Sequence, residues 1–290
     1  MRLFSYLRNT QPSIGVITDA HGTRFVDLAQ LVPGLPGDMT DLLALPGALS
    51  KVTSAHATLE AGAGDSLEGT TFLPLVPRPG KVVCMGLNYA DHAREGGNAI
   101  PDYPAVFLRG GSSQVAHGQP LIKPRVSDQF DYEAELAVVI GKTARHLTPN
   151  NALDCVAGYS AYNDASVRDY QRKSAQWTMG KNFDGTGAFG PWLVTPDELP
   201  PGANGLKVQT LLDGEVMQNG NTRDFIWSVS RTLEIISECM TLHPGDVVIT
   251  GTPAGVGYAR KPPVFLKEGN RCDIVIEGIG TLSNPIRAEA

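Results

Sequence analysis

The 290-residue sequence lacks the patterns that would assign it to a membrane or to nucleic acid. No run approaches the roughly 18 consecutive apolar residues of a membrane span. The N-terminal segment, residues 1–8, has no apolar core of the kind found in signal peptides. The net charge is −6 and no basic run is present, which argues against a nucleic-acid surface.

The sequence also has few cysteines and no Cys-x-x-Cys pair. Cys84, Cys155, Cys239 and Cys272 lie far apart, each flanked by apolar or strand-forming residues, which predicts buried free thiols rather than disulfides or a zinc site. Internal repeats and low-complexity segments are absent as well. These features together predict a soluble protein in the reducing cytoplasm, with neither a membrane nor a nucleic acid as partner.

What the chain does contain is turn-forming residues, 32 glycines and 21 prolines, which favour strands and loops over long helices. Prolines near residue 76 predict a boundary between a small N-terminal unit, residues 1–75, and a larger domain, residues 76–290. The small unit shows two strands, at 13–17 and 23–28, and a helix at 38–45 with Asp38 available as its cap. It shows no residues that suggest chemistry.

An acidic stretch at residues 131–141 precedes an apolar, β-branched run. Glu133 and Glu135 are two residues apart, so on a strand they point to the same face. Asp164 follows a second strand-like segment, and a short helix predicted at 148–158 allows the two strands to run antiparallel, which brings the three carboxylates together. Three carboxylates without His or Cys suit Mg²⁺ or Mn²⁺ rather than Zn²⁺. The alternative is a solvated strand edge.

Three further segments carry polar groups beside predicted strand ends. His92 and Glu95 share a face if residues 90–95 form a helical turn, although an exposed polar turn is the plain alternative. Lys181 lies in a loop rich in glycine and aromatic residues, where a partly buried lysine near the metal and a solvated lysine are equally good readings. The glycine-rich loop at 251–257 offers backbone N–H groups and a threonine hydroxyl to an oxygen-rich ligand.

Two other segments favour structural readings. Arg109 ends a predicted strand and is able to hold a carboxylate, but a solvated strand-end arginine is the default. From Asp224 an amphipathic helix is predicted, and its apolar stripe through Leu233 and Ile236 belongs to the core.

Taken together, the sequence resembles the fumarylacetoacetate hydrolase family, particularly acylpyruvate hydrolases and oxaloacetate decarboxylases. The matching motifs occur in the family's order between residues 81 and 287: GLNYADH at 86–92, DYEAEL at 131–136, NDASVRD at 163–169, GK at 180–181 and TGTPAGV at 250–256. The resemblance implies a β-rich α+β fold, a mixed β-sandwich roll with a small N-terminal α/β unit, and a homodimer.

The resemblance also implies roles for individual residues. The family's ligands for Mg²⁺ or Mn²⁺ correspond to Glu133, Glu135 and Asp164. The catalytic His-Glu pair falls on His92 and Glu95, and the site lysine on Lys181. Substrate contacts map onto Thr252, Gln171 and Arg109, where many members have lysine instead of arginine.

The implied function is metal-dependent hydrolysis of a C–C bond in a 1,3-dioxo acid, such as an acylpyruvate or fumarylpyruvate. In that mechanism a divalent ion fixes the oxo acid, His92 oriented by Glu95 activates water, and Lys181 neutralises the oxyanion. The rivals are decarboxylation of oxaloacetate or isomerisation of a related 2-oxo diacid, and a non-enzymatic binding protein that keeps the fold. The intact acidic triad and His-Glu pair argue against the last.

Overall fold

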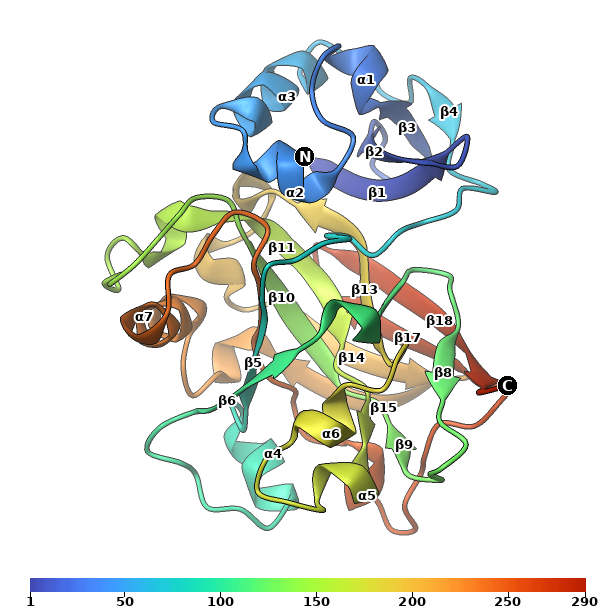
Figure 1. Cartoon of the computed structure of the whole chain (residues 1–290), viewed down its shortest axis with the longest axis vertical. Helices are drawn as coiled ribbons and strands as arrows, with labels where there is room; N and C mark the ends of the chain where they lie inside the picture. Colours follow the sequence, from blue (N-terminus) through green and yellow to red (C-terminus); the bar gives the residue numbers. More distant parts are fainter.

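The computed structural model describes residues 1–290 as two mixed sheets with short helices around them (Figure 1). The large sheet has 11 strands in the order β4-β3-β2-β1-β13-β11-β10-β16-β5-β6, with β7 beside β13. Its strands are β1 (Arg2–Arg8), β2 (Gln11–Ile17), β3 (Arg24–Asp27), β4 (Asp65–Ser66), β5 (Val82–Gly86), β6 (Ala105–Arg109), β7 (Gln114–Ala116), β10 (Ala134–Ile140), β11 (Val156–Asn163), β13 (Gly187–Val194) and β16 (Val247–Ile249).

The second sheet has five strands in the order β15-β14-β17-β18-β8, and a two-stranded ribbon joins β12 to β9. These strands are β8 (Leu121–Lys123), β9 (Phe130–Asp131), β12 (Ser166–Val167), β14 (Lys207–Leu212), β15 (Glu215–Asn221), β17 (Arg271–Ile276) and β18 (Gly280–Ala288). The predicted β-rich α+β fold is confirmed.

Helices are short, and none is both long enough and apolar enough to cross a membrane. They are α1 (Leu28–Leu31), α2 (Met39–Ala44), α3 (Ala48–His56), α4 (Ala90–Glu95), α5 (Arg168–Gln171), α6 (Thr178–Lys181) and α7 (Val229–Cys239). Helices α4, α5 and α6 gather at the end of the molecule opposite the N-terminal strands and helices (Figure 1).

The N-terminal residues continue the large sheet. Strand β1 pairs with β13 in antiparallel fashion, so strands from both sides of residue 76 share one hydrogen-bonded layer. The predicted strands at 13–17 and 23–28 correspond to β2 and β3. Helix α2 is capped as expected, because the Asp38 side chain accepts hydrogen bonds from the amides of Thr40 and Asp41.

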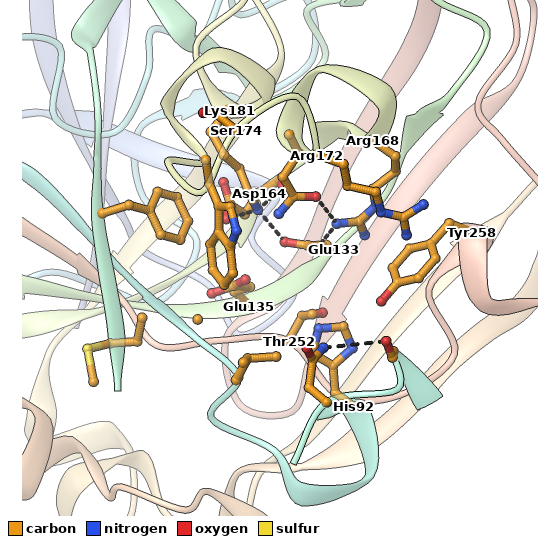
Figure 2. A pocket seen from close by; sticks show the side chains of 18 residues that line it. His92, Glu133, Glu135, Asp164, Arg168, Arg172, Ser174, Lys181, Thr252 and Tyr258 are labelled. Atoms are coloured by element: carbon orange, nitrogen blue, oxygen red, sulfur yellow. Dashed lines mark hydrogen bonds and ion pairs between the residues drawn. The ribbon is translucent and has the colours of Figure 1, made fainter. Parts of the chain in front are cut away.

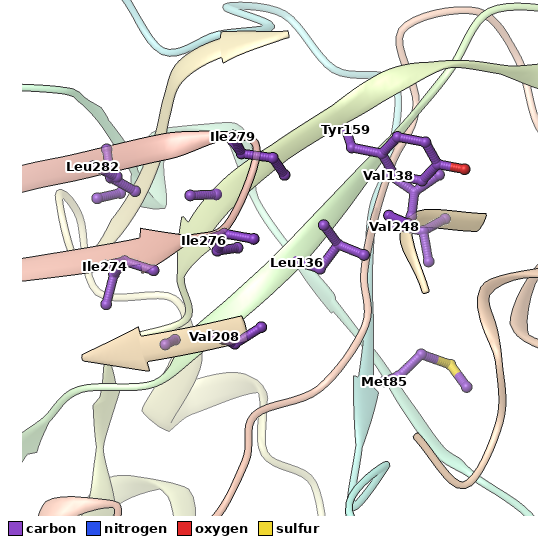
Figure 3. Close-up of a cluster of buried hydrophobic side chains, with 14 of the residues drawn as sticks. Met85, Leu136, Val138, Tyr159, Val208, Val248, Ile274, Ile276, Ile279 and Leu282 are labelled. Carbon is purple, nitrogen blue, oxygen red and sulfur yellow. The ribbon is translucent and has the colours of Figure 1, made fainter. Parts of the chain in front are cut away.

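Strand β10 is buried on both faces, which explains its uninterrupted apolar sequence. Leu136 and Val138 face the five-stranded sheet, where they pack in one cluster with Ile274 and Ile276 (Figure 3). The alternate side chains Ala137 and Val139 belong to the cluster formed with the N-terminal residues. Core packing on two sides therefore fixes the position of the acidic residues at the start of this strand.

The predicted helix at 148–158 is wrong. Only a single 3₁₀ turn forms, at Ala152–Cys155, and the chain then enters β11, which pairs along its length with β10. Gly158 lies inside the strand, where a Cβ atom would lie 2.5 Å from the carbonyl oxygen of Val194. Glycine is needed there for close approach of β13 rather than to end a helix.

Two further expectations need correction. Helix α7 begins at Val229, with Ser228 as its cap, rather than at the predicted Asp224. The side chain of Asn88 holds the backbone N–H and C=O of Trp227 and so keeps the preceding residues out of the helix. Three of the cysteines are buried free thiols, whereas Cys239 at the end of α7 is exposed.

Candidate active site

A pocket of about 300 Å³ opens at the end of the large sheet where α4, α5 and α6 gather. Its lining includes the apolar side chains of Met85, Phe107 and Trp177. It also includes Arg168 and Arg172, which lie beside the predicted carboxylates (Figure 2). The pocket therefore offers a ligand apolar surface and cationic groups around an acidic centre.

The three predicted metal ligands lie together in this pocket. Strands β10 and β11 run antiparallel with Ala134 opposite Asn163, so Glu133 and Glu135 flank the position where Asp164 leaves β11. The amide of Asp164 donates a 2.9 Å hydrogen bond to the carbonyl of Glu133, which fixes this register. One carboxylate oxygen from each acid lies within 4.8 Å of the others, and all three side chains are buried.

Glu133 is surrounded by cations. Lys181 donates from Nζ to Glu133 and to Asp164 over 2.6 Å each, and Arg168 Nη1 lies 2.6 Å from Glu133. Burial alone raises the pKa of Glu133, but the charges of Arg168 and Lys181 outweigh it and lower the pKa to about 2. For Lys181 burial acts to lower the pKa, and the charges of Asp164 and Glu133 raise it instead. Both groups are therefore held charged.

Glu135 is in the opposite situation, because it is buried without an ion-pair partner. Its only hydrogen bond comes from the backbone amide of Gly251. Burial and the charges of Asp164 and Glu133 raise its pKa well above the ordinary glutamate value. A divalent cation bound between the three acids would supply the missing positive charge, and an all-oxygen donor set suits Mg²⁺ or Mn²⁺. The residues present therefore fit such an ion.

Arg109 does not line the pocket, which corrects the prediction of a substrate contact. Its buried guanidinium lies behind Asp164, with Nη1 2.5 Å from the carboxylate and Nη2 donating to Thr186. The other expectation for Arg109, a solvated strand end, is also wrong. Arg109 therefore orients Asp164, a candidate metal ligand, from the side away from the pocket.

His92 and Glu95 form a pair on α4. Glu95 Oε1 accepts from Nδ1 of His92 over 2.9 Å, while Oε2 accepts from the amide of Gly255 over 2.8 Å. Nε2 of His92 makes no hydrogen bond within the protein, and the ring lines the pocket beside Thr252 (Figure 2). Glu95 thus fixes the ring so that Nε2 is the nitrogen available to a ligand.

The loop at residues 251–257 uses its amides differently from the prediction. They bind three carboxylates of the protein rather than a ligand: the amides of Gly251, Gly255 and Gly257 donate to Glu135, Glu95 and Asp131. Thr252 lines the pocket, but its hydroxyl donates to the carbonyl of Ala134 and accepts from Gln218. The loop is a support for the acidic side chains.

Several pocket residues were missed or only partly predicted from sequence. Gln171 lines the pocket as expected, and it also accepts a 3.0 Å bond from Arg168 Nη1. Arg168 itself, in the NDASVRD motif, carried no predicted role, nor did Asp131, which binds its Nε over 2.8 Å. Arg172 and Tyr258 also line the pocket. The only available signal was their proximity in sequence to the motifs.

Comparison with known proteins agrees with this geometry. The family model described as "Fumarylacetoacetate (FAA) hydrolase C-terminal" matches residues 81–287. The chain is 40% identical over 278 residues to oxaloacetate tautomerase FAHD2A, mitochondrial, of Bos taurus, covering 95% of this chain and 87% of that protein.

Solved structures also resemble the whole chain, and in the following two 100% of both chains is covered. Fumarylacetoacetate hydrolase from Exiguobacterium antarcticum is 35% identical with a TM-score of 0.82. Maleylpyruvate hydrolase from Sphingobium sp. SYK-6, in complex with manganese(II) and pyruvate, is 28% identical, also with a TM-score of 0.82. The chain belongs to the fumarylacetoacetate hydrolase family.

Proposed function

We propose that this protein is a divalent-metal-dependent enzyme that interconverts the keto and enol forms of a 2-oxo acid of the oxaloacetate type. The observation that carries the proposal is the His92–Glu95 pair, with Nε2 of His92 unengaged, in the same pocket as the buried acidic triad. This arrangement combines a site for a cation that binds oxo acids with a group suited to moving a proton.

The similarity to oxaloacetate tautomerase FAHD2A, at 40% identity over nearly the whole chain, supports this choice over the hydrolase reading derived from sequence. Tautomerisation is also the least demanding reaction for the site, because it needs one acid–base group and no bound water.

A metal ion held by Glu133, Glu135 and Asp164 would act as a Lewis acid that acidifies the carbon next to the 2-oxo group. His92 Nε2 takes a proton from that carbon. The electron pair of the broken C–H bond forms a double bond to the oxo carbon, and the π electrons of the C=O bond move onto the oxo oxygen. The imidazolium then returns the proton to this oxygen, giving the enol, and the reverse sequence gives the keto form. Glu95 stabilises the transient charge on the ring.

Lys181 places a positive charge beside the region where the negative oxygen develops. All three N–H groups of Lys181 are engaged by Glu133 and Asp164. The residue therefore holds the two acids in place and would act on the reacting oxygen through its charge.

Hydrolysis of an acylpyruvate is the second candidate, supported by the resemblance to a maleylpyruvate hydrolase. The same His92 would take a proton from water, whose oxygen attacks the distal carbonyl. The C–C bond then breaks with its electrons passing to the pyruvate fragment. Decarboxylation of oxaloacetate is the third candidate reaction, and release of CO₂ distinguishes it from the other two.

The test compares the wild-type protein, stripped with EDTA and reloaded with Mg²⁺ or Mn²⁺, on oxaloacetate, acetylpyruvate and fumarylpyruvate. Loss of the enol absorbance of oxaloacetate without CO₂ release is expected. His92→Gln should lower kcat by about 100- to 10,000-fold, the usual contribution of a positioned acid–base group, while metal binding measured by calorimetry stays unchanged. Cleavage of an acylpyruvate alone would establish the hydrolase, and CO₂ release the decarboxylase. Full activity of His92→Gln would disprove the proton-transfer role.

The homodimer and the cytoplasmic location expected from sequence stay predictions. Sedimentation velocity at micromolar protein concentration would measure the first. The metal preference is equally a proposal, and titration of the stripped protein with each ion would measure it.

A further inference from the structure

Arg172 is an exposed arginine at the pocket that has no acidic partner. Its guanidinium forms no ion pair and no hydrogen bond, and instead stacks on the ring of Tyr258 with 4.4 Å between the guanidinium carbon and the ring centroid. Both residues line the pocket. Free arginines on a surface usually extend into water, so one held against a pocket tyrosine is positioned for a ligand.

A second guanidinium lies against the same ring. The central carbon of Arg168 is 4.6 Å from the centroid of Tyr258. Arg168 is buried, with Nε bound to Asp131 and Nη1 bound to Glu133, but its Nη2 is buried without any hydrogen-bond partner. An unsatisfied buried donor of a charged group carries a free-energy cost of the kind that a ligand relieves.

Arg172 has no acid left to pair with, because the acids near it are already engaged by other groups. Asp131 is occupied by Arg168 and by three backbone amides, Glu133 by Arg168 and Lys181, and Glu95 by His92 and Gly255. The free guanidinium of Arg172 and the unpaired Nη2 of Arg168 therefore lie on the same ring with donors that an anion can occupy. The arrangement is therefore built for an anion.

We propose that Arg172 and Arg168, stacked on Tyr258, bind the second carboxylate of a short 2-oxo dicarboxylate, which makes them the determinants of diacid over monoacid specificity. This inference rests on the proposed function, since it assumes that the oxo-acid end of the substrate lies at the acidic triad. Planar guanidinium groups match a carboxylate with two parallel hydrogen bonds.

The same geometry selects for a short substrate. Arg168 contacts the metal-ligand candidate Glu133 through Nη1 and leaves Nη2 of the same guanidinium unpaired, so the anion site lies directly beside the acidic triad. A four-carbon diacid, with one carbon between its oxo group and its second carboxylate, suits this spacing. Phe107 and Trp177, which are in edge-to-face contact and also line the pocket, carry no charged group that would bind a carboxylate.

The experiment measures binding with two unreactive ligands that differ only at the distal group. Malate carries a carboxylate where 2-hydroxybutanoate carries a methyl group. Calorimetric titration of the Mg²⁺-loaded wild-type protein should show malate binding about 10- to 100-fold more tightly, as a charge-assisted hydrogen-bond pair predicts. Arg172→Gln should remove most of this preference while leaving the affinity for 2-hydroxybutanoate unchanged, and Arg172→Lys should keep part of it.

Lys173→Gln is the matched control. Lys173 is also exposed and also lies over a tyrosine, with Nζ 3.3 Å from the ring centroid of Tyr170, but it does not line the pocket. This variant removes the same charge one residue away and should leave both affinities unchanged. An equal loss in the two variants would show a general electrostatic effect and overturn the proposal.

The remaining outcomes separate this proposal from the proposed function. A malate preference that depends on Arg172, in a protein that does not tautomerise oxaloacetate, would support the carboxylate site and reject the reaction. Tautomerisation of oxaloacetate without any effect of Arg172→Gln on the malate preference would reject the site and support the reaction.

Discussion

Two buried carboxylates, one in the N-terminal unit and one in the pocket, differ in how their charge is satisfied. Asp27 accepts hydrogen bonds from the hydroxyls of Tyr6 and Ser13 over 2.6 Å each and from the amide of Ala29, and lies 3.0 Å from Arg8. Glu135 receives a single backbone amide and has two other acids beside it. Burial is therefore no guide to function, whereas incomplete satisfaction of a buried charge is.

The pKa values of Asp27 and Glu135 are also shifted in opposite directions. Burial raises the pKa of Asp27, but the hydrogen bonds from Ser13 and Tyr6 outweigh burial and the pKa is lowered overall. For Glu135 burial and the neighbouring acids act in the same direction. One carboxylate stabilises the fold by being charged, and the other is costly to charge until a cation binds.

The sharpest test of this comparison is Glu135→Gln. The amide keeps the size of the side chain but removes a charge and a ligand oxygen, so Mg²⁺ affinity should fall by about 100-fold or more, because losing even a group that only orients a ligand costs about 10- to 100-fold. The metal-free variant should be at least as stable as the metal-free wild type. Calorimetric titration and thermal unfolding with and without Mg²⁺ measure both effects. Unchanged Mg²⁺ affinity would contradict the assignment.

Arg109→Gln should have the next largest effect. The change removes the guanidinium that holds Asp164 from the side away from the pocket. Metal affinity is therefore expected to fall by about 10- to 100-fold. Substrate KM at saturating metal should change far less, since Arg109 does not reach the pocket. A steady-state measurement at several Mg²⁺ concentrations separates the two quantities, and a KM effect alone would restore the substrate-contact role.

Asp27→Asn should have the smallest effect on function and a clear effect on stability. Losing charged hydrogen bonds within the N-terminal unit should lower the free energy of unfolding by about 1–3 kcal/mol, while Mg²⁺ affinity and turnover remain unchanged. Urea unfolding followed by fluorescence measures the difference. Loss of metal binding in this variant would mean that the two buried acids are coupled.

The pH dependence of the stability difference between the wild type and Asp27→Asn tests whether the pKa of Asp27 is lowered in the folded protein. Because the pKa of Asp27 is lower in the folded than in the unfolded protein, its stabilisation is fully present above about pH 4, the unfolded value, and is lost as pH falls through the folded value. The stability difference between the wild type and Asp27→Asn should therefore be largest near neutral pH and shrink below pH 4. A difference that grows on acidification would contradict the lowered pKa.

Local sequence patterns were sufficient for the parts of the molecule that depend on local or repeated spacing. The alternation of Glu133 and Glu135, the turn that brings Glu95 to His92 and the cap at Asp38 all involve residues within a few positions of each other. The antiparallel meeting of the two acidic elements followed from the short connection between their strands.

The remainder depends on partners that are distant in sequence. Arg109 reaches Asp164 across 55 residues, and the amide of Gly251 reaches Glu135 across 116. Asn88 changes where α7 begins from 139 positions away. Local propensity contains no information on such contacts, and the end of the helix expected at 148–158 failed for the same reason, since residues from Val156 on pair with β10.

The loop at residues 251–257 has a consequence for how the site responds to change. Its amides hold one carboxylate of the acidic triad, the carboxylate that orients His92 and the carboxylate that anchors Arg168. Gly255 has φ +105° and leaves no room for a Cβ atom, which would lie 2.4 Å from the carbonyl of Met217. Cation binding, proton transfer and the placement of Arg168 thus share one support, so a change in the backbone of this loop would disturb all three together.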